Sequence, residues 1–113
     1  MSREARENRR ALQARIAQCA DEIETLRRQA NPARQAVVNL AERLGRKHHP
    51  KRRGEPAYKN EWFANLRTLF IPNKSPLRQG TAHKILGQLE EDLAAMRQRL
   101  EDLGGPINGN RNT

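Results

Sequence analysis

Residues 82–103, AHKILGQLEEDLAAMRQRLEDL, contain the pattern that decides the expected fold. Apolar side chains recur there at intervals of three and four residues, which places them along one face of an α-helix. This seam consists of Ala82, Leu86, Leu89, Leu93, Met96, Leu100 and Leu103. Two glycines and a proline follow directly and are typical of a helix end. We therefore predict a helix over about residues 76–103, with an apolar face that requires a partner.

The first part of the chain offers that partner. Residues 3–30 carry a second seam with heptad spacing, made of Leu12, Ile16, Cys19, Ile23, Leu26 and Ala30. We expect the two seams to pack antiparallel, with Leu26 against Leu93 and Ile16 against Leu103. This pairing predicts a helical hairpin, either within one chain or exchanged between two copies of it.

Charged side chains beside the seams agree with the same register. Glu22 would lie near Arg99, and Arg27 near Glu90, so both neighbours carry opposite charges. An exposed ion pair of this kind contributes only ~0.2–1 kcal/mol. The agreement between the charges and the apolar pattern nevertheless favours this antiparallel arrangement.

A second helix is expected over residues 32–45. Its apolar positions continue the phase of the first seam, although Pro32 interrupts the backbone hydrogen bonds between the two stretches. Asn31 and Pro32 are also suitable residues for a fresh helix start. We therefore expect a kink with little change of direction at this point, although a turn of the chain at Asn31–Pro32 is the alternative.

A third helix is expected over residues 57–70, where aromatic and leucine side chains recur at helical spacing. This spacing indicates that the aromatic side chains lie in the core rather than on the surface. Tyr58 is the best candidate for an exception, because it is the aromatic residue nearest to the basic segment. The aromatic residues of this stretch are Tyr58, Trp62, Phe63 and Phe70.

The composition also favours helices. Ala, Leu, Arg, Gln and Glu dominate, while aromatic residues make up only 4% of the chain. We predict an all-α fold, a helical hairpin or small bundle with coiled-coil-like packing of the first and last helices. The expected organisation is one helical domain over residues 1–104, with a basic loop over 45–56 and a disordered tail over 105–113.

The charge of the chain is strongly positive. Twenty-two Lys and Arg face 13 Asp and Glu, for a net charge of +9 and a pI of about 11.0. The excess lies in the middle, with seven basic and two acidic residues over 31–56 and five and one over 57–84. Such a balance is typical of proteins that bind nucleic acid. Binding to an anionic membrane would require an amphipathic helix with an aromatic-rich apolar face, and no membrane partner is expected.

The most basic segment is GRKHHPKRRGEP, residues 45–56. Its Pro and Gly residues disfavour a helix, so successive side chains can reach different phosphates. The alternative is a solvated run of charge. Metal binding is not expected, because adjacent His48 and His49 point apart and the other candidates, His83 and Cys19, lie far away in sequence.

Nine basic residues are the candidate phosphate contacts, drawn from this segment and from the residues that follow it. They are Arg46, Lys47, Lys51, Arg52, Arg53, Arg67, Lys74, Arg78 and Lys84.

Catalysis finds no support in the sequence. No Ser-His-Asp or Cys-His grouping, Gly-rich phosphate loop or paired carboxylate stands out, and Cys19 occupies an apolar seam position. We expect a protein that is not an enzyme and that requires no cofactor or metal. No apolar run is long enough to span a membrane, and no secretory signal begins the chain. The expected location is the cytoplasm or nucleoid, or the nucleus in a eukaryote.

The leading hypothesis is a non-catalytic protein that binds the nucleic-acid backbone as a small subunit of a nucleoprotein complex. In size, charge and expected helical make-up the chain looks like the small helical subunits of CRISPR effector complexes, by analogy of class and without a shared motif. The alternative is a coiled-coil inhibitor or adaptor that docks its basic surface on an acidic protein. In either case we expect protein partners or a homodimer to form through the helical seams. DNA and RNA, single and double strands, all remain open.

Overall fold

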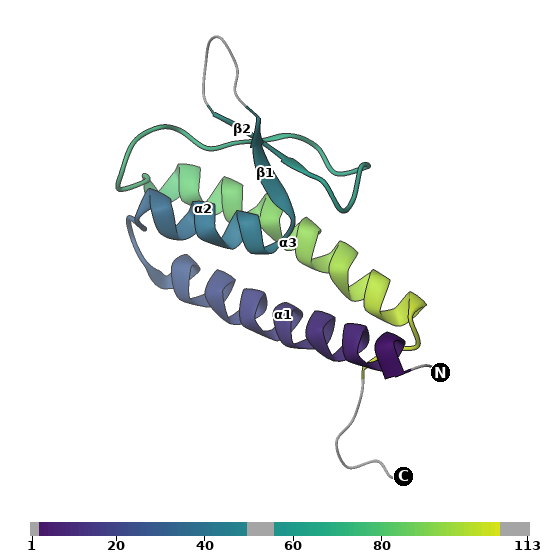
Figure 1. Ribbon diagram of the computed structural model, residues 1–113. Helices are drawn as coiled ribbons and strands as arrows, with labels where there is room; N and C mark the ends of the chain where they lie inside the picture. Colours follow the sequence, from purple (N-terminus) through teal and green to yellow (C-terminus); the bar gives the residue numbers. More distant parts are fainter. Residues whose placement is uncertain (1–2, 50–55, 107–113) are drawn as a thin grey trace.

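The computed structural model describes residues 3–49 and 56–106, with side chains from residue 7 onward (Figure 1). Its elements are α1 (Arg3–Arg28), α2 (Arg34–Arg43), β1 (Arg46–His49), β2 (Ala57–Asn60), β3 (Leu69–Phe70) and α3 (Gln79–Asp102). In these residues a three-stranded antiparallel sheet accompanies three helices, so the predicted all-α bundle is wrong. The predicted disordered tail covers residues 105–113. Residues 107–113 of this segment lie outside the described residues.

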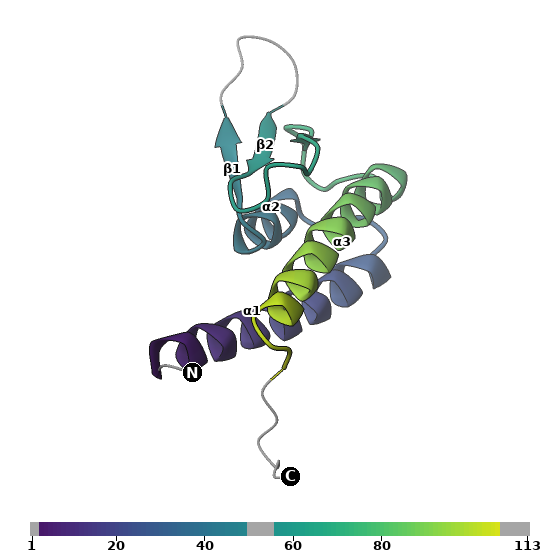
Figure 2. The same ribbon diagram turned by 90° about the vertical axis from the view of Figure 1, so that its right-hand side faces the viewer.

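The antiparallel pair of long helices is α1 and α3, which run side by side in Figure 1 and Figure 2. Both seams are buried in one core, from Ile16 to Leu26 on α1 and from Ala82 to Leu100 on α3. Of the remaining positions of the predicted first seam, Leu12 is partly buried and Ala30 lies beyond α1 and is exposed. The predicted ion pair between Arg27 and Glu90 is confirmed, with a distance of 2.7 Å between its nitrogen and oxygen.

Two details of the predicted register are wrong. Leu103 is 43% exposed rather than buried against Ile16, so the buried seam of α3 ends at Leu100. Glu22 does not pair with Arg99, because the guanidinium of Arg43 on α2 takes its carboxylate. A charge pattern read from two helices alone therefore misses the partner that a third helix supplies.

The chain turns between α1 and α2, so the predicted gentle kink at Asn31–Pro32 is wrong. Arg43, at the end of α2, pairs with Glu22, and its carbonyl accepts a hydrogen bond of 3.1 Å from Arg15. The two helices therefore lie side by side with the chain reversed. Pro32 is buried in the turn, and its carbonyl accepts a 2.9 Å hydrogen bond from the Leu77 amide.

The segment predicted as a third helix, residues 57–70, forms β2, a turn and β3 instead. Part of the predicted basic loop, residues 46–49, is strand β1, which pairs antiparallel with β2. The strand β2 also pairs antiparallel with β3, with Tyr58 opposite Leu69. Figure 2 shows β1 and β2 standing away from the paired helices. Short apolar runs do not distinguish a strand from a helix by spacing alone.

Asn60 ends β2 and starts the turn. Its side-chain oxygen accepts hydrogen bonds from the amides of Trp62 and Phe63, at 2.9 and 3.0 Å. These two local hydrogen bonds compete with the backbone hydrogen bonds of a helix, so they favour a turn. Its side-chain nitrogen donates to the carbonyl of Leu44, at 2.8 Å, so the turn is tied to the end of α2.

A buried ion pair attaches the sheet to α3. Arg46 of β1 donates from Nε and Nη2 to the two carboxylate oxygens of Asp92, at 2.6 and 2.9 Å. Its Nη1 donates to the carbonyls of Tyr58 and Arg67, at 2.8 and 2.9 Å. Asn60 completes the network with a 3.2 Å bond to Asp92. Both charges are therefore paired and hydrogen-bonded, which a buried charge requires.

Candidate nucleic-acid interface

The hairpin of β1 and β2 presents two lysines side by side. Lys47 and Lys59 are cross-strand partners, and both are exposed. Side chains alternate between the faces of a strand, and the neighbouring pair of Arg46 and Asn60 is buried toward α3. The two lysines therefore project from the opposite face. Like charges directly opposite one another destabilise a sheet, and a bound anion would relieve that repulsion.

A second basic group surrounds the start of α3. Lys74 and Arg78 line one shallow cavity, and Lys84 lines its neighbour; Pro72 and Thr81 belong to both. The first turn of α3 contains no acidic residue, and its N-cap residue makes no capping side-chain hydrogen bond. The positive end of the helix dipole therefore adds to the charge of the three side chains.

The remaining candidates divide into three cases. Arg67 is exposed in the segment between β2 and β3, where its backbone carbonyl accepts from Arg46. Arg46 itself is 4% exposed, and Asp92 neutralises its charge, so it has no role at the surface. Three candidates lie outside the described residues: Lys51, Arg52 and Arg53. Their sequence positions place them in the connection between β1 and β2.

The aromatic residues do not lie where the sequence predicts. Tyr58 is 5% exposed, whereas Trp62 is 48% and Phe70 is 42% exposed. The expectation of a common buried face is therefore wrong for Trp62 and Phe70, and Tyr58 is not the exposed exception. The cause is the error in secondary structure, because the turn after Asn60 directs Trp62 away from the core.

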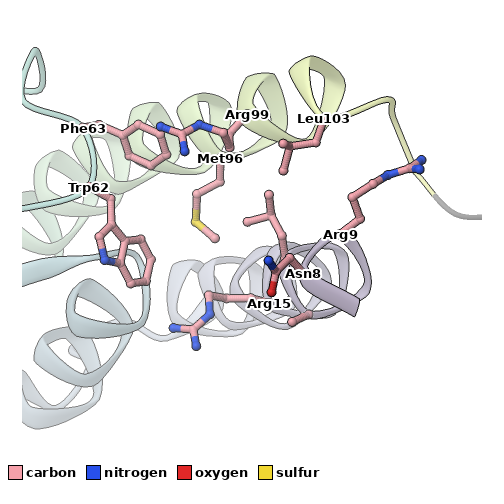
Figure 3. A pocket seen from close by; sticks show the side chains of 10 residues that line it. Asn8, Arg9, Arg15, Trp62, Phe63, Met96, Arg99 and Leu103 are labelled. Atoms are coloured by element: carbon pink, nitrogen blue, oxygen red, sulfur yellow. The ribbon is translucent and has the colours of Figure 1, made fainter. Parts of the chain in front are cut away.

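Trp62 stands at one end of a groove between α1, α3 and the turn that follows β2 (Figure 3). The groove has a volume of about 520 Å³. Figure 3 shows Trp62 and Phe63 at one end, Arg9 and Leu103 at the other, and the Met96 side chain between them. The groove thus brings exposed aromatic and basic side chains together in one concave site.

Three arginines border this groove, and the sequence analysis did not select any of them. The guanidinium of Arg15 lies 5.3 Å from the centroid of the Trp62 ring, and that of Arg99 lies 5.5 Å from the Phe63 ring. Arg9 holds the end of α3 by donating to the carbonyls of Gly104 and Gly105. These side chains come together only because the turn that follows β2 lies between α1 and α3. The spacing of residues along the chain does not indicate this arrangement.

The described residues contain neither a cluster of metal ligands nor a reactive thiol. No group of three or more His, Cys, Asp or Glu is placed there to hold a metal ion. His48 lies against the Tyr58 ring, with 5.2 Å between the centroids, and the Nε2 of His49 lies 3.5 Å from a carboxylate oxygen of Glu61. Burial, reinforced by the nearby Glu22 carboxylate, raises the pKa of the Cys19 thiol to about 11. This thiol therefore stays protonated at neutral pH.

None of the helices in residues 3–49 and 56–106 combines the length and the apolar character that a membrane-spanning helix needs. No protein-family model matches the chain, and no curated protein or solved structure matches it either.

Proposed function

We propose that this protein is a non-catalytic binder of the nucleic-acid backbone, working as a subunit of a nucleoprotein complex. The observation that carries the proposal is the exposed pair of Lys47 and Lys59 on adjacent strands, without a carboxylate partner among the described residues. Lys74, Arg78 and Lys84 extend the positive charge to the start of α3. Contacts of this kind neutralise phosphates and do not read bases.

Binding should depend strongly on salt. Each phosphate that a Lys or Arg neutralises releases condensed counterions, so the logarithm of the affinity falls linearly with the logarithm of the salt concentration. Contact with five phosphates predicts a slope of about −4.5 for duplex DNA and about −3.5 for a single strand. Fluorescence anisotropy of labelled oligonucleotides at several salt concentrations measures this slope.

The variant Lys47→Ala/Lys59→Ala tests the cross-strand pair. We expect a lower affinity and a shallower salt slope, by up to about 1.8 on duplex DNA and about 1.4 on a single strand. The fold should persist, because both side chains are exposed and their mutual repulsion disappears. Anisotropy gives the affinity and circular dichroism gives the melting temperature.

A matched control is Arg10→Ala/Arg97→Ala, which removes the same charge from exposed positions on α1 and α3. Its salt slope should stay close to that of the original protein. An equal loss in both double variants would show that net charge alone matters and that the lysine pair forms no interface. If the protein binds neither DNA nor RNA at low salt, the proposed function is wrong.

The three basic residues between β1 and β2 give a separate prediction, which rests on the sequence alone. Changing Lys51, Arg52 and Arg53 together to Ala should make the slope on duplex DNA shallower by up to about 2.7. The loss of affinity should be similar for all base sequences, because phosphates carry no base identity. A loss confined to one base sequence, measured with a panel of oligonucleotides, would instead indicate base readout.

A further inference from the structure

We infer that the groove at Trp62 binds an unpaired nucleotide, with the base stacked on the indole ring and the phosphates near Arg15 and Arg99. The inference rests on the proposed function and makes it more specific, because it predicts a preference for single strands. It starts from the position of Trp62, which is 48% exposed and stands at one end of the groove.

The ring is held in place before any ligand arrives. The Trp62 amide donates to the Asn60 side chain at 2.9 Å, and Asn60 is itself fixed by Leu44 and Asp92. Gly45, with a φ of 99°, lets the ring approach the backbone, since a Cβ there would be 2.5 Å from the indole. A platform that is ordered in advance lowers the entropic cost of binding.

The charges of the groove select an anion. Among its ten lining residues are three arginines, and there is no Asp or Glu. Arg15 donates one hydrogen bond of 3.1 Å to the carbonyl of Arg43, and its guanidinium has four further N–H donors. Arg99 has no ion-pair partner among the described residues. Both guanidinium groups lie against aromatic rings, so a phosphate bound there would adjoin a stacked base.

The shape of the groove favours a nucleotide over a larger ligand. Its volume of about 520 Å³ is within the ~300–1,000 Å³ typical of small-molecule sites. The lining residues extend from Asn8 to Arg15 on α1 and from Met96 to Leu103 on α3. Each stretch is about two helical turns, or roughly 10 Å long. A base within a duplex cannot present its face to a side chain, so the site requires a single strand.

The combination of aromatic faces and arginines is the one by which proteins bind single strands without reading their sequence. An acidic helical peptide is the competing ligand, because it would also satisfy the arginines and the apolar floor. The 48% exposure of Trp62 favours the nucleotide, since stacking uses an accessible aromatic side chain and no particular base. Binding of such a peptide is therefore one of the outcomes that the test distinguishes.

Trp62 is the single tryptophan of the chain, so its fluorescence reports on the site directly. The full chain is titrated with a short oligothymidine and with an abasic strand of the same length and phosphate number. We expect the oligothymidine to quench the fluorescence and to bind more tightly than the abasic strand. Equal affinity for both strands, without quenching, would overturn the stacking inference while leaving backbone binding intact.

Variants of Trp62 provide the second measurement. Trp62→Ala should weaken oligothymidine binding about 5- to 150-fold, equivalent to ~1–3 kcal/mol for one stacked base. Its affinity for the abasic strand should not change, and Trp62→Phe should recover part of the loss. An equal loss on both strands would show a structural role and overturn the inference.

Two further outcomes separate the two proposals. If neither strand binds the original protein, both the proposed function and this inference are wrong. If an acidic amphipathic peptide quenches Trp62 at concentrations at which oligothymidine does not, the groove is a protein-docking site and the nucleotide inference is wrong. The unmodified protein gives both results, so neither depends on a variant that folds.

Discussion

Asp92→Ala should destabilise the protein by about 3–5 kcal/mol, the cost of leaving one partner of a buried ion pair without its counterion. Asp92 is fully buried, and Arg46 is 4% exposed, so the guanidinium of Arg46 could not reach water without moving β1. A small domain has only about 5–15 kcal/mol of stability in total. Chemical denaturation followed by circular dichroism measures the loss.

A double-mutant cycle separates the ion pair from the other contacts of Arg46. In the background of Arg46→Met the same Asp92→Ala change should cost much less, because no unpaired guanidinium remains. Arg46→Met is itself destabilising, since it leaves the buried Asp92 carboxylate without its counterion and the carbonyls of Tyr58 and Arg67 without their donor. A loss below about 1 kcal/mol in the single variant Asp92→Ala would contradict the buried pair.

The same ion pair explains why the sheet could not be predicted from the sequence. Arg46 and Asp92 lie 46 residues apart, and nothing in the basic segment around Arg46 distinguishes it from its exposed neighbours. A Lys or Arg in a charged run is usually solvated. The sequence therefore indicates a surface role for a side chain that in fact attaches β1 to α3. Contacts that are distant along the chain override local propensity here.

The long helices could be predicted because their information is local. The first seam has a regular spacing from Leu12 to Ala30 and the second from Ala82 to Leu103, and the pairing of Arg27 with Glu90 follows from the same register. Of the candidate site, the sequence could identify which residues are basic, and it selected Lys47, Lys74, Arg78 and Lys84. The groove at Trp62 could not be predicted from the sequence, because the residues that line the groove come from three separate segments.

Leu93→Ala should cost about 2–5 kcal/mol, the range measured when a buried leucine is truncated and leaves a cavity. Leu93 lies in the core between α1 and α3 and is only 4% exposed. The loss should appear as a lower denaturation midpoint in the same circular dichroism measurement. A midpoint that does not depend on protein concentration would indicate that the antiparallel pair forms within one chain rather than between two copies.

Leu103→Ala is the matched control, since the sequence assigns Leu103 to the same seam and the structure leaves it 43% exposed. Truncation there should change the stability by only about 0.5 kcal/mol, as for other surface positions. Equal losses at Leu93 and Leu103 would mean that the seam of α3 is buried along its whole length, as the spacing alone predicts. A large loss at Leu93 with a small one at Leu103 would instead agree with a buried seam that ends at Leu100, so that Leu103 lines the end of the groove away from Trp62.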